Sequence, residues 1–497
     1  MKSQETIPAG EGLATRSRSH RYVPLACWTV TILVLILIPL KIVSYGYVPG
    51  GDLRRHVAKA FTDKPYNEIV VMRPGYTIDH SPGWEWLLRE LHRQAGWGQD
   101  ALVSFSVIAL LLCFFFAPLS WLRRPEAWLA ALLAEFLARP TLLGNRQTQG
   151  RPLLLTEAFL VMLLLAWSRP GSNKPSWLKV GLTCVGFGLS VWVHGAWYLW
   201  VVPLTAFFLA GAWRAGLWLT GCWLIGTLAG AAITGRPFDL LTTAVNMARA
   251  IYHEHLPSWM LVGEFAPDTG DLGTLTVLAF VFLLSWWQNK LRPDLFQQPV
   301  VWLMMIGWIL GFQADRFWAD WGLPAALVWM ALQLQELAAG FFGAADLKRL
   351  VAAVLIAAPL FLNATADYNR RYTFNLSQPF LSAQDPRLQG WFPGHDGIFY
   401  SVQMDLFYDT FYTNPNGDWR YIMAFEPALM PDEDWNIYHR IVWNREAFQA
   451  YEPWIRKMRP EDRLVIFSGT QPNLPQLEWI DAADYIWIGR LPAGKSP

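Results

Sequence analysis

Long apolar runs separated by short polar turns recur along the chain between residues 23 and 364. Several approach the roughly 20 residues that a helix needs to cross about 30 Å of hydrocarbon. A membrane β-barrel would instead show segments of about ten residues with alternating polarity. We therefore expect a mainly α fold, a polytopic transmembrane helical bundle of about 11 spans. The predicted spans are residues 23–45, 101–121, 126–141, 153–167, 177–193, 197–213, 216–233, 273–288, 299–313, 322–342 and 350–364.

The pattern changes after residue 366, where the long apolar runs stop and Trp, Tyr and Asp become frequent. Residues 464–467 and 485–488 predict short strands, and residues 446–458 predict a helix between turns. We therefore expect two domains. Residues 1–365 form the transmembrane domain, with a first outer loop over residues 46–100, and residues 366–497 form a small C-terminal extracytoplasmic α/β domain.

Composition supports a membrane protein. Of the 497 residues, 53% are apolar and only 16% are charged, so the several soluble domains usual for this length are not expected. The formal net charge of +1 gives no reason to expect a nucleic-acid partner. All four cysteines lie within apolar runs, where packing is a simpler interpretation than disulfide or metal chemistry.

Basic residues at the N-terminus set the expected orientation. They precede the first apolar run, and no small-residue cleavage site follows it, so we interpret this run as an uncleaved span. Cytoplasmic loops are enriched in Lys and Arg, which places the N-terminus inside. An odd number of spans then places the C-terminal domain outside. We expect an integral protein of a bacterial inner membrane whose functional face is extracytoplasmic.

Many cations nevertheless fall on the outer side. Cations kept there against the usual bias indicate a site for an anionic ligand, with binding of lipid headgroups as the alternative. The outer segments are residues 46–100, 140–152, the turn near His194, residues 235–272 and residues 314–321.

Asp52 is the first candidate for chemistry. It follows a Pro-Gly-Gly turn that lets the backbone approach a ligand, and Arg54, Arg55 and His56 come directly after it. Neighbouring cations favour the ionised carboxylate, which can accept a proton from a hydroxyl or an amine. The alternative is an ordinary helix start followed by a solvated amphipathic helix.

Asp79 and His80 end the same outer loop. Pro82 restricts Ser81 to extended geometry, and the aromatic run after it predicts a helix at the membrane interface. Asp79 and His80 would then meet a ligand just before this helix, unless Ser81 or Asp79 simply caps it.

Glu157 lies about one turn inside the fourth apolar run, where an acid is costly and suggests a function. Arg146 and Arg151 precede it, and either one could form a buried pair with it. Arg316 lies between two apolar runs with aromatic neighbours, which suits a phosphate group; pairing with Asp315 or Asp320 is the alternative. His194, at an outer span end, is more simply a satisfied interfacial residue.

Together these residues resemble the GT-C superfamily of integral membrane glycosyltransferases, in particular the branch of protein O-mannosyltransferases and lipid A aminoarabinose transferase. Asp52 is similar to the acid that opens the first outer loop of this family, and Arg316 with Phe317 resembles its late Arg-Tyr. Leu155, Thr156, Glu157 and Ala158 are similar to its Leu-Thr-Asp-Ala. Asp79, His80, Ser81 and Pro82 take the place of its Glu-Lys-Pro-Pro-like motif, with His80 in place of Lys.

The resemblance implies inverting transfer of a sugar from a polyprenyl-phosphate donor to an extracytoplasmic acceptor, which is a lipid, a glycan or a protein. It implies Asp52 as general base and Glu157 as a second catalytic acid. The donor phosphate would be held by His80, Arg146, Arg151 and Arg316, and further substrate contacts would come from Asp79, His56 and His194. Membrane lipids are expected partners. The resemblance requires no cofactor with certainty, and a divalent metal, Mg or Mn, is compatible with it.

Two other classes of function fit parts of the pattern. A polysaccharide polymerase or ligase also uses outer Arg and His residues, but its key residues should lie in one large late loop. A non-catalytic membrane binding or transport protein should show internal repeats or charges in the middle of its spans, whereas the ionisable residues here lie mainly at span ends.

Overall fold

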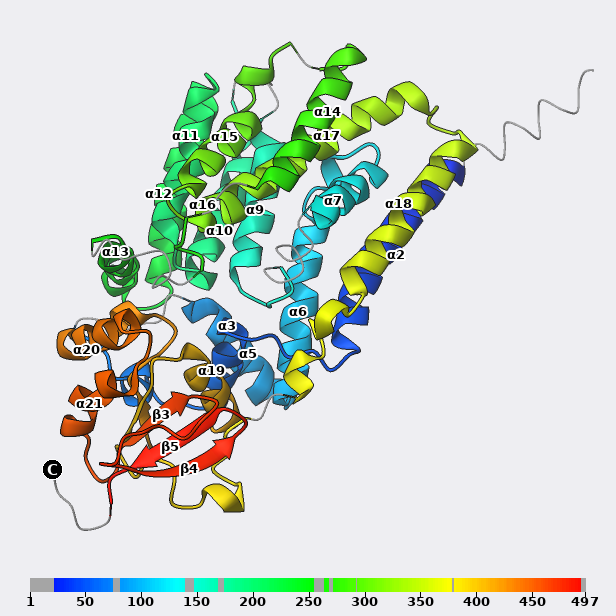
Figure 1. Ribbon diagram of the computed structural model, residues 1–497. Coiled ribbons are helices and arrows are strands. Elements are labelled where there is room, and N and C mark those ends of the chain that lie inside the picture. Colours follow the sequence, from blue (N-terminus) through cyan, green and yellow to red (C-terminus); the bar gives the residue numbers. More distant parts are fainter. Residues whose placement is uncertain are drawn as a thin grey trace, which may run out of the picture.

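The computed structural model describes residues 22–74, 81–138, 147–168, 174–253, 263–267, 271–291, 293–377 and 380–492. Figure 1 shows an array of long helices on one side and a small sheet with short helices on the other. The chain is mainly helical with a small C-terminal sheet, as the apolar pattern predicts.

Each of the eleven apolar runs contains a helix. Among the described residues, four helical segments are long and apolar enough to cross a membrane by length and composition: α2, α6 with the turn that follows it to Trp121, α12 and α18. The expected count of about 11 spans is therefore not confirmed. The eleven helices are α2 (Tyr22–Val43), α6 (Gln99–Phe116), α7 (Glu126–Ala138), α9 (Leu153–Trp167), α10 (Trp177–Val193), α11 (Val201–Leu209), α12 (Trp213–Ala232), α14 (Leu272–Trp287), α15 (Pro299–Gly311), α17 (Leu323–Phe341) and α18 (Leu347–Thr365).

Small residues allow the closest helix pair to form. Gly188 of α10 faces Gly226 and Gly230 of α12, and a Cβ atom at Gly230 would lie 2.3 Å from the carbonyl oxygen of Gly188. Glycine at such crossings lets helix backbones approach without side chains between them, which is a common basis of helix packing in membranes.

The first outer loop contains three helices, α3 (Asp52–Ala60), α4 (Tyr66–Ile69) and α5 (Pro82–Ala95). Helices α3 and α5 lie between the long helices and the sheet (Figure 1). The segment 235–272, expected as a loop, contains a further helix, α13 (Pro237–His253). Sequence reasoning missed α13 because it is amphipathic rather than uniformly apolar. Its buried Leu240 packs with Val191 and Ala231 of the neighbouring helices.

The C-terminal region contains a five-stranded sheet in the order β2-β1-β3-β5-β4. Strand β1 is parallel to β2 and β3, and β5 is antiparallel to β3 and β4. The two predicted strands are present as β3 and β5. The strands are β1 (Ile398–Tyr400), β2 (Arg420–Tyr421), β3 (Arg463–Phe467), β4 (Glu478–Ala483) and β5 (Ile486–Arg490), with helices α19 (Met404–Thr413), α20 (Asp432–Trp443) and α21 (Glu452–Lys457).

The single helix predicted over residues 446–458 is wrong in extent. A 3-10 turn (Phe448–Tyr451) precedes the short helix α21, and Pro453 lies in the first turn of α21. Proline is favoured there because that position has no helical hydrogen bond for its missing N–H group.

The first outer loop is packed into the C-terminal region. Val70 forms a parallel bridge to Tyr421 of β2, and the Val71 N–H donates to the Tyr421 carbonyl at 2.9 Å. Tyr66 and Ile69 share an apolar core with Phe407 and Tyr421. The boundary at residue 366 remains a prediction, and this shared core joins the two sides of it.

A buried ion pair holds α18 against α7. Arg349 donates to Glu126 from Nε at 2.6 Å and from a terminal nitrogen at 3.0 Å. Both side chains are buried. Charges taken out of water are tolerated when they are paired in this two-point geometry.

We predict that Arg349→Met lowers the free energy of unfolding by up to about 3–5 kcal/mol, because buried Glu126 loses its two-point partner and keeps only Arg124, 4.0 Å away. The double variant Glu126→Gln/Arg349→Met should recover much of that loss. Thermal unfolding of the detergent-purified protein measures both, with exposed Lys348→Met as the control. Equal losses in the single and double variants would contradict this assignment.

Candidate functional site

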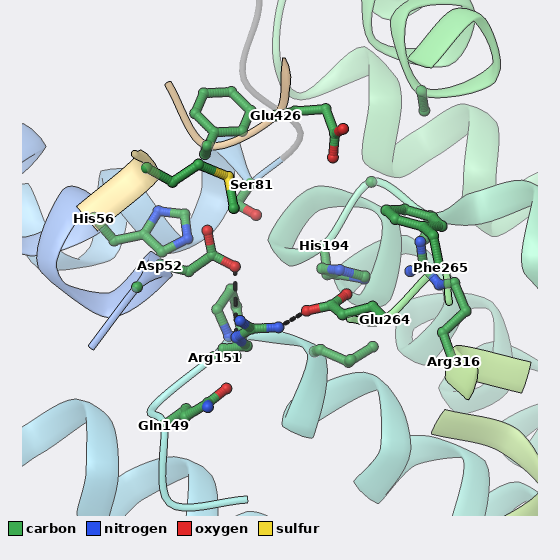
Figure 2. Close-up of a pocket in the computed structure, with 18 of the residues that line it drawn as sticks. Asp52, His56, Ser81, Gln149, Arg151, His194, Glu264, Phe265, Arg316 and Glu426 are labelled. Carbon is green, nitrogen blue, oxygen red and sulfur yellow. Dashed lines mark ion pairs between the residues drawn. The ribbon is translucent and has the colours of Figure 1, made fainter. Parts of the chain in front are cut away.

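A cavity of about 350 Å³ lies where the outer segments meet the C-terminal region. Its wall is formed by the start of α3, Ser81, the turn before α9, the turn after α10, one face of α13, residues 264–265, Arg316 and two stretches after residue 400. Figure 2 shows the side chains that project into it. The volume is within the range of sites for small ligands.

Asp52 is the first residue of α3 and lines the cavity. Gly51 occupies the helix-capping position with φ of 77°, a conformation that glycine adopts at little cost. The Asp52 carboxylate accepts hydrogen bonds from Arg55 Nε at 3.1 Å and from the Tyr408 hydroxyl at 3.3 Å. Its second oxygen lies 3.6 Å from Arg151 Nε. Asp52 is thus held in place by groups from three parts of the chain.

A buried polar cluster supports Asp52 from behind. His56, one turn further along α3, has its Nδ1 atom 3.3 Å from the Glu85 carboxylate of α5. The Tyr66 hydroxyl donates to the same carboxylate at 2.5 Å, and Arg55 donates to the Tyr66 hydroxyl at 3.2 Å. These contacts fix α3 against α5 and Tyr66, and so hold Asp52 and His56 toward the cavity.

Arg151 connects two carboxylates. It pairs with Asp52 on one side and with Glu264 on the other, as the dashed lines in Figure 2 indicate. Gly150 makes this placement possible, because its φ is 63° and a Cβ atom there would lie 2.7 Å from the Leu53 side chain. The turn before α9 can therefore pack directly against α3.

Arg316 lies on the opposite wall. Its guanidinium is 5.1 Å from the centre of the Phe265 ring, and its Nε is 3.7 Å from Asp320. The backbone N–H of Arg316 donates to the Glu264 carbonyl at 3.0 Å, which ties the two residues together. Within the described residues, no acceptor forms a hydrogen bond with the Arg316 guanidinium. Its terminal nitrogens are therefore available to an anion in the cavity.

The backbone after Arg316 is unusual. Residues Trp318–Gly322 form a π turn, a feature that often occurs at functional sites. Trp318 donates from its indole nitrogen to Asp271 at 3.0 Å, and a Cβ atom at Gly322 would lie 2.4 Å from the Trp318 ring. The turn that follows Arg316 is thus anchored to the start of α14.

The C-terminal region supplies the remaining wall, including Tyr408, Phe425 and Glu426. The Phe425 ring lies 4.1 Å from the Arg55 guanidinium. Burial raises the pKa of Glu426 to about 8, while the Ala428 N–H and Arg316 lower it and Asp52 raises it. Burial also raises the pKa of the Tyr408 hydroxyl well above its usual value, so this group remains a donor to Asp52.

The structure brings together five of the residues selected from the sequence, and all five line the cavity: Asp52, His56, Arg151, His194 and Arg316. Asp79, His80 and Arg146 lie outside the described residues. Glu157 is buried in α9 and is not among the lining residues. It lies one turn further along α9 than Leu153, which does line the cavity, and its expected catalytic role stays a prediction.

Sequence reasoning missed Glu264, Tyr408 and Glu426. Glu264 lies in an outer segment that the charge pattern had selected, but nothing in its immediate neighbours distinguishes it. Tyr408 and Glu426 belong to the C-terminal region, where acids and aromatics are frequent, so their types alone gave no signal.

The described lining residues do not suit a divalent metal. Among the described residues, no group of three or more His, Cys, Asp or Glu side chains is placed to hold a metal ion. Asp52 and Glu264 instead share Arg151. The expectation of Mg or Mn stays a prediction, and no step below depends on it.

The helical array, with a polar cavity beneath a C-terminal sheet region, has a fold similar to that of a solved archaeal oligosaccharyltransferase. The crystal structure of the Archaeoglobus fulgidus oligosaccharyltransferase in the apo form matches with a TM-score of 0.52 at 12% identity, over 88% of this chain and 69% of that chain. Its complex with Zn and sulfate matches with a TM-score of 0.46 at 15% identity, over 87% and 67%.

At this level of identity, the likeness shows the fold alone. No protein-family model matches the chain, and no curated protein sequence matches it. The apolar helices indicate an integral membrane protein, and the likeness in fold does not by itself identify an activity.

We predict that Glu426→Gln changes how stability depends on pH. An unfolded Glu titrates near 4.5, whereas folded Glu426 titrates near 8, so between these values the folded state keeps a proton that the unfolded state releases. Wild-type stability should therefore fall relative to the variant as pH rises from 5 to 8, by at most about 1.4 kcal/mol per pH unit. Above pH 8 the difference should be constant. Melting temperatures of both proteins measure this, and a difference independent of pH would refute it.

Proposed function

We propose that the protein is an inverting membrane glycosyltransferase that moves a sugar from a polyprenyl-phosphate donor to an extracytoplasmic acceptor. The observation that carries this proposal is the convergence of Asp52, Arg151 and Arg316 on one cavity within a GT-C fold. These residues come from three separate outer segments. The carboxylate suits a proton acceptor for the attacking group, and the guanidinium groups suit ligands of the leaving phosphate.

In this reaction Asp52 is the general base. It accepts the proton of an acceptor hydroxyl or amine while that atom attacks the anomeric carbon. The bond between the anomeric carbon and the phosphate oxygen breaks, and its electron pair leaves with the polyprenyl phosphate. Attack opposite the leaving group inverts the anomeric configuration.

Arg316 is the main phosphate ligand in this proposal. Its terminal nitrogens make no hydrogen bond within the described residues, and the Phe265 ring orients its guanidinium. A fixed guanidinium stabilises the negative charge that grows on the phosphate as the sugar leaves. Arg151 is already shared by Asp52 and Glu264, so we assign it a positioning role together with a secondary contact to the donor.

The other expected residues take supporting roles. His56 and His194 line the cavity and are proposed to contact the sugar or the acceptor. Asp79 and His80 directly precede Ser81, a lining residue, and Arg146 directly precedes the turn that carries Arg151, so their proposed contacts rest on sequence alone. The proposal also places the protein in a bacterial inner membrane, with the cavity on the extracytoplasmic side. It leaves the acceptor open as a lipid, a glycan or a protein.

We predict that Asp52→Asn lowers the rate of sugar transfer by roughly 100-fold or more, since the amide cannot accept the proton. The variant should keep its expression level and melting temperature, because Asn retains acceptors for Arg55 and Tyr408. Transfer from a radiolabelled polyprenyl-phosphate sugar in proteoliposomes measures the rate. Full activity in a folded Asp52→Asn protein would remove Asp52 from the mechanism.

We predict that Arg316→Ala raises the KM for the donor by about 10–100-fold, the usual effect of losing a charged hydrogen bond to a phosphate. Arg316→Lys should recover only part of it, because an ammonium group lacks the two-point geometry of guanidinium. The KM for the acceptor serves as the internal control. An unchanged donor KM in Arg316→Ala would show that the phosphate is held elsewhere.

A further inference from the structure

Glu426 is a buried acid in the wall of a cavity that contains two arginines. It is 8% exposed and lines the cavity from the C-terminal region. Within the described part of the chain it forms no ion pair, and its carboxyl accepts a hydrogen bond from the Ala428 N–H. Figure 2 shows its carboxyl on the side of the cavity opposite Arg151. The proposed reaction does not yet use this group.

The loop that carries Glu426 is held on three sides. Phe425 packs against Arg55 of α3 and lies edge-on to Tyr66, with ring centres 5.9 Å apart. The 3-10 turn directly after Glu426 (Pro427–Leu429) packs against α13. Arg73 donates to the Leu429 carbonyl from its backbone at 2.8 Å and to the Met430 carbonyl from its side chain at 2.7 Å. The carboxyl is therefore fixed at the cavity wall.

The surroundings of Glu426 favour its neutral form. Burial raises its pKa to about 8; Arg316 opposes that change and Asp52 adds to it. Tyr408 and Tyr438 also face it, and burial keeps both hydroxyls neutral by raising their own pKa values. At neutral pH the side chain is a carboxylic acid with an O–H group to donate.

We propose that Glu426 is a specificity-determining residue that donates a hydrogen bond from its neutral carboxyl to a phosphate oxygen of the lipid-linked donor, beside Arg316. This proposal rests on the proposed function. A neutral O–H donor and a guanidinium can bind two oxygens of one tetrahedral phosphate. An ionised carboxylate at the same position would repel the phosphate. The C-terminal region would then lower the affinity for the donor.

Binding of farnesyl phosphate to the full-length protein in detergent tests this. Wild type, Glu426→Gln and Glu426→Ala are compared at pH 6.5 and pH 9 by isothermal titration calorimetry. Binding that needs the neutral form should weaken about tenfold in wild type over this range, because only about a tenth of a group titrating near 8 stays neutral at pH 9. Glu426→Gln keeps an N–H donor and cannot ionise, so its affinity should not show this loss. Farnesyl phosphate itself titrates, but it does so equally for both proteins. The ratio of the dissociation constants of wild type and Glu426→Gln at each pH therefore removes this effect.

Further variants separate the possible failures. Glu426→Ala should bind about five- to tenfold more weakly than wild type at pH 6.5. Glu446→Gln is the matched control, because Glu446 is a partly buried acid of the same region whose pKa is also raised by burial, but it does not line the cavity. Inorganic phosphate should bind far more weakly than farnesyl phosphate at every pH if the ligand is a lipid phosphate.

The role of Glu426 would be overturned if the ratio of the dissociation constants of wild type and Glu426→Gln does not change with pH. An unchanged affinity in a folded Glu426→Ala protein would overturn it as well. The proposed donor site itself would then still stand if Arg316→Ala abolishes binding of the probe. If wild type and Arg316→Ala bind farnesyl phosphate equally, the donor site is wrong and the role of Glu426 fails with it.

Discussion

The arrangement of the cavity depends on Arg151, a guanidinium shared by two carboxylates from different segments. Asp52 begins α3 in the first outer loop, and Glu264 lies in the segment between α13 and α14. The Glu264 carbonyl in turn accepts the backbone N–H of Arg316. A carboxylate at the edge of an apolar bundle is stable only when it is paired, so this continuous set of contacts holds three segments around one space.

The C-terminal region belongs to the same structure. Arg55 donates to Asp52 with one part of its guanidinium and stacks on the Phe425 ring, so a single buried side chain positions both the candidate base and the loop that covers it. The bridge between Val70 and Tyr421 extends the C-terminal sheet with a residue of the first outer loop. The wall that contains Glu426 therefore cannot shift far without disturbing α3.

The apolar pattern predicted the helices well, because a run of apolar residues has few stable alternatives to a buried or lipid-facing helix. It did not predict how many cross the membrane, because α11 and α15 are shorter than a full span. The meeting of Asp52, Arg151 and Arg316 was predictable from charges kept on one side of the bundle. The contribution of Glu426 was not, because it depends on how a distant loop docks on α3.

Glu157 shows a different limit of sequence reasoning. Glu157 follows Leu153 by four residues and therefore shares its face of α9, but helical spacing does not give depth along the bundle. One turn of helix, about 5.4 Å, separates a lining residue from a buried one. The catalytic role that the sequence suggests for Glu157 therefore stays a prediction.

Under the proposed reaction, the cations around Asp52 have two opposing effects. A carboxylate held by Arg55 and Arg151 stays charged but is a weaker proton acceptor than an unpaired one. The leaving phosphate gains negative charge as the sugar departs, and it then competes for Arg151. If Arg151 turned toward the phosphate in this reaction, it would release Asp52 at the stage when the acceptor gives up its proton. Proton transfer to Asp52 and departure of the phosphate are then favoured at the same stage of the reaction, which a base without this shared guanidinium would not achieve.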